Sequence, residues 1–315
     1  MQKLRVNKQN WRFLAPEQRG KGKRDMRQLI PALFLFSSLF LLFTFFSIYP
    51  LPLSLPFPFS ALFPPPHAGA YKLVFILAGQ SNMAGRGPLY SDSDPYDQYS
   101  PHLSVLRLNR WLHWETAREP MHYDIDVNKT CGVGPGLVFA KSVLQKVHYS
   151  YGEVVIGLVP CAVGGTKIEK WTKGLGLYDS AVKRAKAAVE AKRGGGRIEA
   201  LLWYQGETDT VNFDDAEVYA EKMETLIRNF RADLGLPHLP VIQVALASGE
   251  GNYTGKVRAA QKGIQLHNVR TVDAYGLPLL NDNLHLNTEA QIRLGHMLAQ
   301  SYLSLLDELN STPQP

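Results

Sequence analysis

The 315-residue sequence predicts a three-layer α/β/α sandwich around a central, mostly parallel, five-stranded sheet. From residue 70 onward, short apolar runs flanked by turn-forming residues alternate with longer amphipathic stretches. Such alternation is typical of parallel strands that carry helices on both faces of the sheet. Right-handed crossovers then bring the carboxyl ends of the strands to one edge, where folds of this class bind their ligands.

The five apolar runs predict strands over residues 71–78, 153–159, 198–204, 241–247 and 269–274. Helical spacing predicts helices over residues 135–148, 180–192, 215–234, 255–267 and 288–309. A long segment, residues 88–134, separates the first strand from the first of these helices. Because so long a loop in a compact domain usually has a function, we expect it to cover part of the site.

The positive charge of the chain is concentrated in its first 28 residues. They hold nine Lys and Arg against Glu17 and Asp25, a net charge of +7, whereas the whole chain carries +6. Everything after residue 28 therefore has a net charge of −1. A folded body without excess basic residues has no surface for gripping phosphates, so we predict no nucleic-acid partner.

Residues 29–49 contain no charged side chain and are rich in Leu and Phe. As a helix, this segment is long enough to cross the hydrocarbon core of a bilayer. A cleaved signal peptide usually has an apolar stretch of only about 7–15 residues, so we favour an uncleaved signal anchor. The positive-inside rule then leaves residues 1–28 in the cytosol and puts the body in the lumen. The alternative is a signal peptide that is removed.

Seven prolines between residues 50 and 66 are incompatible with a regular helix or a central strand, so residues 50–69 are predicted to form an extended stem. One folded domain is predicted over residues 70–309, followed by a disordered tail over 310–315. Glycosylation sequons at Asn128, Asn252 and Asn310 fit a lumenal body. The protein would then be a single-pass type II membrane protein of the Golgi or cell surface, or a secreted protein if the apolar segment is cleaved.

Polar groups follow four of the five predicted strands. Gly79 allows a sharp turn after the first strand, which would deliver Ser81 to a surface. The groups that follow the other strands are, in chain order, Gly164-Gly165, then Gln205-Gly206-Glu207-Thr208-Asp209, and finally Asp282 with His285. Parallel strands would bring all of them to the same edge of the sheet.

These groups match what acyl transfer requires. A serine hydroxyl attacks an ester only when a base takes its proton, and His285 can do so if Asp282 fixes its tautomer. The negative oxygen of the tetrahedral intermediate needs hydrogen-bond donors, which the Ser81 N–H, the Gly164 N–H and the Gln205 side-chain amide are placed to supply. We therefore predict Ser81, Asp282 and His285 as catalytic residues and these three donors as the oxyanion hole.

Each group also has a structural interpretation when taken alone. Ser81 would be the N-cap of the following helix, Gly164-Gly165 a tight turn, and Glu207 or Asp209 a helix cap or the partner of a lysine. An Asp-x-x-His sequence arises by chance in many loops. Their joint occurrence at one edge, in an order compatible with one site, favours the catalytic interpretation.

Four segments resemble successive blocks of the SGNH hydrolase superfamily, whose fold is flavodoxin-like: GQSNMAGRG (79–87), AVGGT-x-I-x-x-W (162–171), WYQGETD (203–209) and D-x-x-H (282–285). Together with residues 121–126 and 132–136, they are most similar to the plant carbohydrate acetylesterase branch, which shares the sialate O-acetylesterase/acetylxylan esterase domain, and the similarity runs from about residue 71 to 305. The resemblance implies Ser81 as nucleophile, His285 as base and Asp282 as the residue that orients it. It also implies that Gly164 and Gln205 complete the oxyanion hole, with Gln205 standing where the superfamily has its asparagine.

We therefore predict a serine esterase that removes O-acetyl groups from a carbohydrate through a covalent acyl-enzyme, with an acetylated plant cell-wall polysaccharide as substrate. Gln80, Asn82, Gly165 and Glu207 lie beside the catalytic groups in the sequence and are predicted to bind substrate. Two alternatives stay open: an esterase or lipase that acts on other esters, and a noncatalytic carbohydrate-binding protein with the same fold.

The resemblance implies no metal or organic cofactor, and His102, His113 and His122 are too irregularly spaced to indicate a zinc site. Cys131 and Cys161 are the only cysteines. In a lumenal protein they would either form one disulfide or remain two separate buried thiols.

Overall fold

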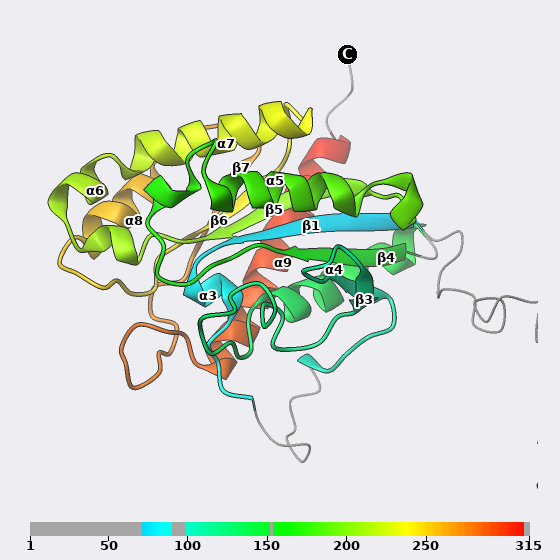
Figure 1. The fold of residues 1–315 in the computed structure, drawn as a ribbon, viewed down its shortest axis with the longest axis horizontal. Coiled ribbons are helices and arrows are strands. Elements are labelled where there is room, and N and C mark those ends of the chain that lie inside the picture. The colour runs from blue at the N-terminus through cyan, green and yellow to red at the C-terminus, as the bar shows by residue number, and fades with distance from the viewer. Residues whose placement is uncertain (1–70, 90–98, 152–153, 312–315) are drawn as a thin grey trace, which may run out of the picture. The chain divides into compact units, whose positions relative to one another are not determined.

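The computed structural model describes residues 71–89, 99–151 and 154–311. Within these residues, one sheet of seven strands runs in the order β3-β2-β4-β1-β5-β6-β7 (Figure 1). All neighbouring strands are parallel except β2 and β3, which are antiparallel. The predicted α/β class with a mostly parallel sheet is confirmed, but the predicted number of five strands is wrong.

The five predicted strands are all present, as β1 (Tyr71–Gly79), β4 (Val154–Pro160), β5 (Arg197–Tyr204), β6 (Val241–Ala245) and β7 (Val269–Asp273). The two additional strands, β2 (Val105–Leu108) and β3 (Trp114–Thr116), belong to the long segment after the first strand. They have only four and three residues, and each carries a charge in its middle. Strands this short and polar lack the apolar run from which a buried strand is predicted.

In β2, a buried ion pair accounts for the burial of a strand that has no long apolar run. The Arg107 side chain is fully buried, forms an ion pair with Asp124, and lies 3.1 Å from Glu115 of β3. Its guanidinium also stacks 4.6 Å from the centre of the Tyr123 ring. Because a buried charge is tolerated only when it is paired, these partners are what allow β2 to lie inside the sheet.

The predicted helices correspond to α4 (Gly136–Tyr151), α5 (Gly176–Ala188), α6 (Phe213–Glu217) followed by α7 (Tyr219–Leu234), α8 (Thr254–Lys262) and α9 (Thr288–Ser311). A one-turn helix, α3 (Ser81–Ala84), follows β1, and three 3₁₀ turns are η3 (Ile168–Trp171), η4 (Ala191–Arg193) and η5 (Thr208–Thr210). The prediction ran α8 to residue 267, but the helix ends at Lys262 with Gly263 as its C-cap, since glycine is unfavourable in a helix interior.

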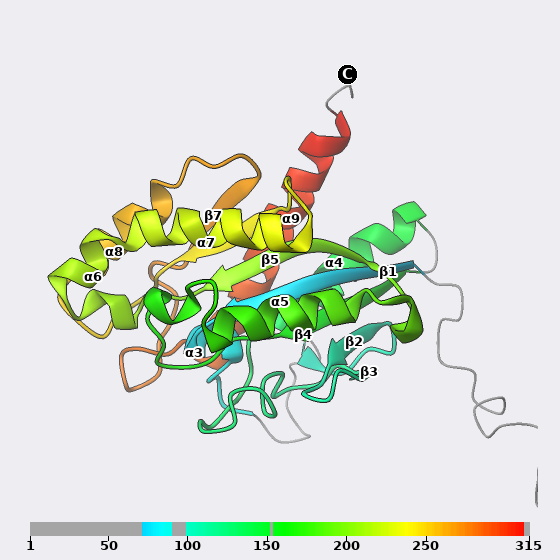
Figure 2. The ribbon, with the colours of Figure 1, turned by 45° about the horizontal axis from the view of Figure 1, so that its top comes forward.

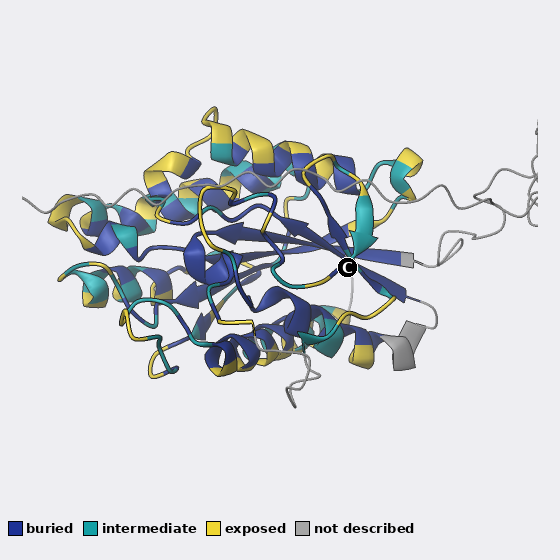
Figure 3. Ribbon diagram, turned by 60° about the horizontal axis from the view of Figure 1, so that its bottom comes forward, coloured by how far each residue is buried: buried dark blue, intermediate teal, exposed yellow. Residues whose placement is uncertain are grey.

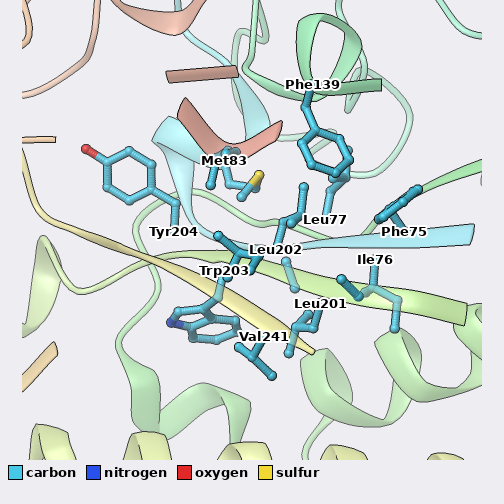
Figure 4. Close-up of a cluster of buried hydrophobic side chains, with 14 of the residues drawn as sticks. Phe75, Ile76, Leu77, Met83, Phe139, Leu201, Leu202, Trp203, Tyr204 and Val241 are labelled. Atoms are coloured by element: carbon cyan, nitrogen blue, oxygen red, sulfur yellow. The ribbon is translucent and has the colours of Figure 1, made fainter. Parts of the chain in front are cut away.

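Two helical layers cover the sheet (Figures 1 and 2). Helices α4 and α9 pack together on one face, where Phe75 of β1 lies edge-on against Phe139 and Tyr302, with ring centroids 4.9 and 5.0 Å apart. Helices α5, α7 and α8 cover the other face, and there Trp171 packs against Trp203 at 5.1 Å. Side chains of β1 alternate between the two cores, and each fully buried Val, Leu, Ile or Phe contributes about 1.5–3 kcal/mol (Figure 4).

The carboxyl end of β1 lies where the order of the strands reverses. Strands β2 and β4 lie on one side of β1, and the chain then crosses to β5 and β6 on the other side. Crevices at such a switch point are the usual ligand sites of open α/β sheets. The chain turns there at Gly79, whose φ is +129° and where an added Cβ would lie 2.0 Å from the Tyr204 carbonyl oxygen, so only glycine fits.

Burial separates the sheet from the outer helix surfaces. The strands and the inward helix faces are buried, whereas the outward faces of the helices are exposed (Figure 3). The asparagines of the three sequons, Asn128, Asn252 and Asn310, are all exposed. Cys131 and Cys161 are both free thiols, so the alternative of a disulfide between them is wrong.

Residues 1–70 and 312–315 lie outside the described residues, and with them the predicted tail, anchor and stem. Among the helices of the described part of the chain, none combines the length and apolar character needed to span a bilayer. Helix α9 extends through Ser311 and therefore includes the first two residues of the predicted tail.

Candidate active site

Three side chains are hydrogen-bonded in series at the carboxyl end of β1. The His285 Nε2 lies 2.9 Å from the Ser81 Oγ, and the His285 Nδ1 lies 2.7 Å from Asp282 Oδ2. The other carboxylate oxygen, Asp282 Oδ1, accepts the backbone N–H groups of Leu284 at 2.9 Å and of His285 at 3.0 Å. The structure thus brings together the three residues predicted as catalytic, although Ser81 and His285 are 204 residues apart in the chain.

The position of Ser81 excludes its structural alternative. Ser81 is the first residue of α3, and the N-cap is Gln80, which makes no side-chain capping bond. The Ser81 hydroxyl instead faces His285. The interpretation of Ser81 as a helix N-cap is therefore wrong.

The electrostatics of Asp282 suit a residue that orients a histidine. Partial desolvation raises its pKa, but hydrogen bonds from the backbone and ring of His285 outweigh that effect and lower the pKa to about 2. The carboxylate is therefore ionised at neutral pH and favours the His285 tautomer that carries its proton on Nδ1. That tautomer leaves Nε2 free to accept a proton from Ser81.

The three predicted oxyanion donors differ in whether each already has a hydrogen-bond acceptor in the protein. Among the described residues, the Ser81 N–H has no hydrogen-bond acceptor. The Gly164 N–H donates to Asp126 Oδ2 at 3.1 Å. The Gln205 Nε2 lies 2.8 Å from the Thr166 carbonyl oxygen and 2.5 Å from Asp209 Oδ2. Gly164 and Gln205 would have to exchange a protein acceptor to bind an oxyanion, and their role stays a prediction.

Gln205 is fixed from several sides. Tyr219 donates its hydroxyl to Gln205 Oε1 at 3.1 Å, and the Gln205 side chain has no exposed surface. Asp209 also accepts the Ile168 N–H at 3.1 Å, and burial raises the pKa of Asp209 to about 6. Asp209 therefore ties the loop after β5 to the first N–H of η3, and among the described residues it forms no ion pair with a lysine.

An ion pair that the sequence did not predict borders Ser81. Arg86 Nη2 lies 2.5 Å from Asp126 Oδ2, and the two side chains are only 11% and 2% exposed. A Cβ built on Gly164 would lie 2.5 Å from Arg86 Nη2, 3.1 Å from Asp126 Oδ2 and 3.3 Å from the Ser81 Cβ. All three side chains thus converge on the bare face of Gly164. In the sequence, Arg86 and Asp126 were marked only by their place in two segments that resemble this family of hydrolases, residues 79–87 and 121–126.

The residues predicted to bind substrate divide by burial. Gln80, Asn82 and Glu207 have no exposed surface, whereas Gly165 is exposed, with a φ of +71° and nothing within 4 Å of the position of a Cβ. The Asn82 Nδ2 donates to Glu207 Oε1 at 2.8 Å, so these two bind each other. Substrate binding by the four residues stays a prediction.

His122, one of the three histidines whose spacing does not fit a zinc site, lies in the protein interior. It is fully buried, and burial lowers its pKa to about 3, so it is neutral in the folded protein. Across the described ranges, no group of three or more His, Cys, Asp or Glu side chains is arranged to hold a metal ion.

An α/β/α sandwich with Ser, His and Asp hydrogen-bonded in this order at its carboxyl edge is characteristic of carboxylic ester hydrolases. The sequence profile of one family, described as carbohydrate esterase, sialic acid-specific acetylesterase, matches residues 71–304. A protein of Arabidopsis thaliana named probable carbohydrate esterase At4g34215 is 53% identical over 240 residues, which are 73% of this chain and 90% of that protein. The chain belongs to this family of carbohydrate esterases and is a carboxylic ester hydrolase.

One solved structure supports the same assignment, and another shows the same fold. The X-ray structure of the Arabidopsis thaliana protein At4g34215 matches this chain with a TM-score of 0.69 and 51% sequence identity. The match covers 74% of this chain and 98% of the Arabidopsis chain. The crystal structure of NanS has a TM-score of 0.61 and covers 76% of this chain and 98% of that one. Its identity is only 19%, so it shares the fold alone.

Proposed function

We propose that this protein is a carbohydrate O-acetylesterase that works through a covalent acetyl-enzyme on Ser81. The observation that carries the proposal is the continuous chain of hydrogen bonds from Ser81 Oγ through the His285 ring to Asp282. Membership of a carbohydrate acetylesterase family supports the acetyl group and the carbohydrate. A plant cell-wall polysaccharide is the substrate that we propose within that class.

In the first half-reaction, His285 Nε2 takes the proton of Ser81 as the oxygen attacks the acetyl carbonyl carbon. The intermediate collapses when the bond to the sugar oxygen breaks and His285 gives this proton to that oxygen, so the sugar leaves with a hydroxyl group and an acetyl ester remains on Ser81. In the second half-reaction, His285 takes a proton from water, the water attacks the acetyl-enzyme, and acetate leaves as Ser81 regains its proton. Asp282 stays ionised throughout and stabilises the imidazolium.

The oxyanion of each intermediate is assigned to the Ser81 N–H, which has no acceptor among the described residues. Gly164 and Gln205 join it when they exchange Asp126 and Thr166 for the substrate oxygen. Donors held in place before the reaction stabilise the developing charge, and removal of one such donor typically costs about 10²–10³ in kcat.

The test compares the full-length protein with its Ser81→Ala variant, and with Ser180→Ala as a matched control at an exposed serine of α5. Acetate release is measured from a panel of acetylated polysaccharides and from 4-nitrophenyl acetate. We expect activity on at least one polysaccharide and on the aryl ester, lost only in Ser81→Ala. Retained activity in Ser81→Ala would contradict the mechanism. Hydrolysis of the aryl ester alone would favour an esterase that acts on non-carbohydrate substrates. Binding of a glycan without hydrolysis would favour a noncatalytic carbohydrate-binding protein.

We also propose that residues 29–49 anchor the protein in a membrane of the secretory pathway, with the catalytic domain lumenal. The support is the length and apolar character of this segment behind a tail of net charge +7. After carbonate extraction of membranes, the full-length protein should remain in the pellet. N-terminal sequencing should find no new terminus near Ala70, since such a terminus would mean that the segment is removed.

A further inference from the structure

The Asn82 side chain holds both chain neighbours of His285. Asn82 Oδ1 accepts the backbone N–H of Leu286 at 2.9 Å, and Asn82 Nδ2 lies 3.3 Å from the carbonyl oxygen of Leu284. Asn82 itself directly follows Ser81. A short, rigid path therefore joins the residue after the nucleophile to the two residues that flank the base.

Glu207 fixes the direction of the Asn82 amide. The Asn82 Nδ2 donates to Glu207 Oε1 at 2.8 Å, and Glu207 comes from the loop after β5. A flipped amide would place Asn82 Oδ1 against two acceptors, Glu207 Oε1 and the Leu284 oxygen, and its NH₂ against the Leu286 N–H. Glu207 thus selects the one orientation in which Asn82 holds both sides of His285.

Both side chains are shielded from a substrate. Asn82 and Glu207 have no exposed surface. Gln291 of α9 donates to the Asn82 carbonyl oxygen at 3.1 Å, and the Ser248 hydroxyl donates to the Leu284 carbonyl oxygen at 2.5 Å. The Asn82 amide is thus enclosed by groups from the loops after β5, β6 and β7. Its contacts are with the protein and point to positioning rather than to binding.

We propose that Asn82 and Glu207 are positioning residues, which set the distance and angle between His285 Nε2 and Ser81 Oγ through their hydrogen bonds to residues 284 and 286. The inference rests on the proposed function of Ser81 and His285. It requires Glu207 as a hydrogen-bond acceptor and does not require its charge. Glutamine has the same shape and keeps an acceptor oxygen, so it should replace Glu207.

The acceptor role agrees with the surroundings of Glu207. Among the described residues, its second oxygen, Oε2, has no hydrogen-bond partner. Burial raises the pKa of Glu207 to about 7; its bond to Asn82 opposes this shift, and the carboxylates of Glu250 and Asp209 add to it. A neutral Glu207 still offers Oε1 to Asn82, because a protonated carboxyl group keeps its carbonyl oxygen as an acceptor.

The experiment uses the full-length protein and four variants: Asn82→Ala, Glu207→Leu, Glu207→Gln and the double variant Asn82→Ala/Glu207→Leu. Glu221→Gln, at an exposed position of α7, is the control. Steady-state hydrolysis of 4-nitrophenyl acetate gives kcat and KM. The rate at which a fluorophosphonate probe labels Ser81 gives a second readout, which depends on serine activation but not on acetyl binding.

We expect Asn82→Ala and Glu207→Leu each to lower kcat by about tenfold to a hundredfold, with KM changed less than about twofold, since a small misplacement of catalytic groups costs this much. Probe labelling should slow by the same factor. Glu207→Gln should stay within about threefold of wild type. The double variant should be no slower than the worse single variant, because both changes break the same contact.

Three outcomes would overturn the inference. A raised KM with normal kcat in Asn82→Ala would assign the residue to substrate binding. Lower melting temperatures with normal kcat and labelling would leave only a role in stability. Equal damage in Glu207→Gln and Glu207→Leu would mean that the charge matters and not the acceptor; this pair decides the question alone if Asn82→Ala does not fold. A wild-type protein that neither hydrolyses the ester nor reacts with the probe would instead refute the proposed function.

Discussion

Replacing Asp282 with Asn tests whether the carboxylate works by choosing the His285 tautomer. In Asp282→Asn, the side-chain oxygen can keep the two backbone N–H bonds that Oδ1 now accepts, at 2.9 and 3.0 Å. The NH₂ group then takes the place of Oδ2, 2.7 Å from His285 Nδ1. Two donors cannot face each other, so Nδ1 must become the acceptor. The ring proton moves to Nε2, which can no longer accept the proton of Ser81.

The expected loss follows from this exchange. In serine proteases, the same substitution lowers kcat by about 10⁴ while the geometry stays intact. The Asp282 side chain is 46% exposed, so water can partly solvate the imidazolium that the carboxylate now stabilises. We therefore expect a smaller loss here, about 10³-fold in kcat/KM, which corresponds to about 4 kcal/mol of transition-state stabilisation.

The assay is hydrolysis of 4-nitrophenyl acetate at pH 7, with thermal unfolding as the control for folding. Because the Asn side chain retains the backbone hydrogen bonds, the melting temperature should fall by no more than a few degrees, about the effect of 1 kcal/mol. A folded Asp282→Asn variant that retains more than a tenth of the wild-type kcat/KM would refute the tautomer argument. His285 would then be oriented by its backbone and by Ser81 alone.

Three further predictions concern backbone fit and buried charge. Gly79→Ala should lower the melting temperature by at least about 5 °C in calorimetry, because its Cβ would lie 2.0 Å from the Tyr204 carbonyl oxygen at a φ of +129°; a change below about 2 °C would contradict this. Gly164→Ala, whose Cβ would lie 3.3 Å from the Ser81 Cβ, should lower kcat by about tenfold or more, and an unchanged kcat would mean that this wall of the site is not tight. Burial raises the pKa of Glu119 to about 8, so the folded state binds this proton more tightly than the unfolded state; stability from this group is complete below about pH 4.5 and is lost as the pH rises toward 8. Urea unfolding at pH 5, 7 and 8.5 measures how much the free energy of unfolding falls between pH 5 and pH 8.5. This fall should be at least about 1 kcal/mol smaller in Glu119→Gln than in the wild type, and equal falls in the two proteins would rule out Glu119 as its cause.

The main elements of the fold were predictable because their signals are local. Buried parallel strands are continuous apolar runs, and the helices around them repeat their apolar residues at a period of 3.6, so both can be recognised in a short window of sequence. Strands β2 and β3 give no such signal. Their place in the sheet depends on the ion pair between Arg107 and Asp124, 17 residues apart, and on pairing with β4. A window around β2 shows an arginine but not the partners that make its burial possible.

The meeting of Ser81, His285 and Asp282 was predictable for a different reason. A parallel sheet brings the ends of distant strands to one edge, so the topology puts Ser81 and the segment that carries His285 at the same edge of the sheet, although β7 lies three strands away from β1. The topology does not show which hydrogen bonds form at that edge. The bond from Gly164 to Asp126 and the bond from Asn82 to Glu207 join residues 38 and 125 positions apart, and neither follows from spacing or periodicity.

Burial distinguishes two kinds of polar residue that stand side by side in the motifs. Ser81 and Asn82 are consecutive, yet the hydroxyl of Ser81 faces a histidine that is 21% exposed, whereas the amide of Asn82 turns into the protein. Unpaired buried amides and carboxyls are costly, so residues such as Asn82 and Glu207 must find protein partners. Those partners are the segments that carry the reacting groups. Polar residues clustered at the end of a strand therefore identify the site, but which of them act on a substrate depends on the direction of each side chain.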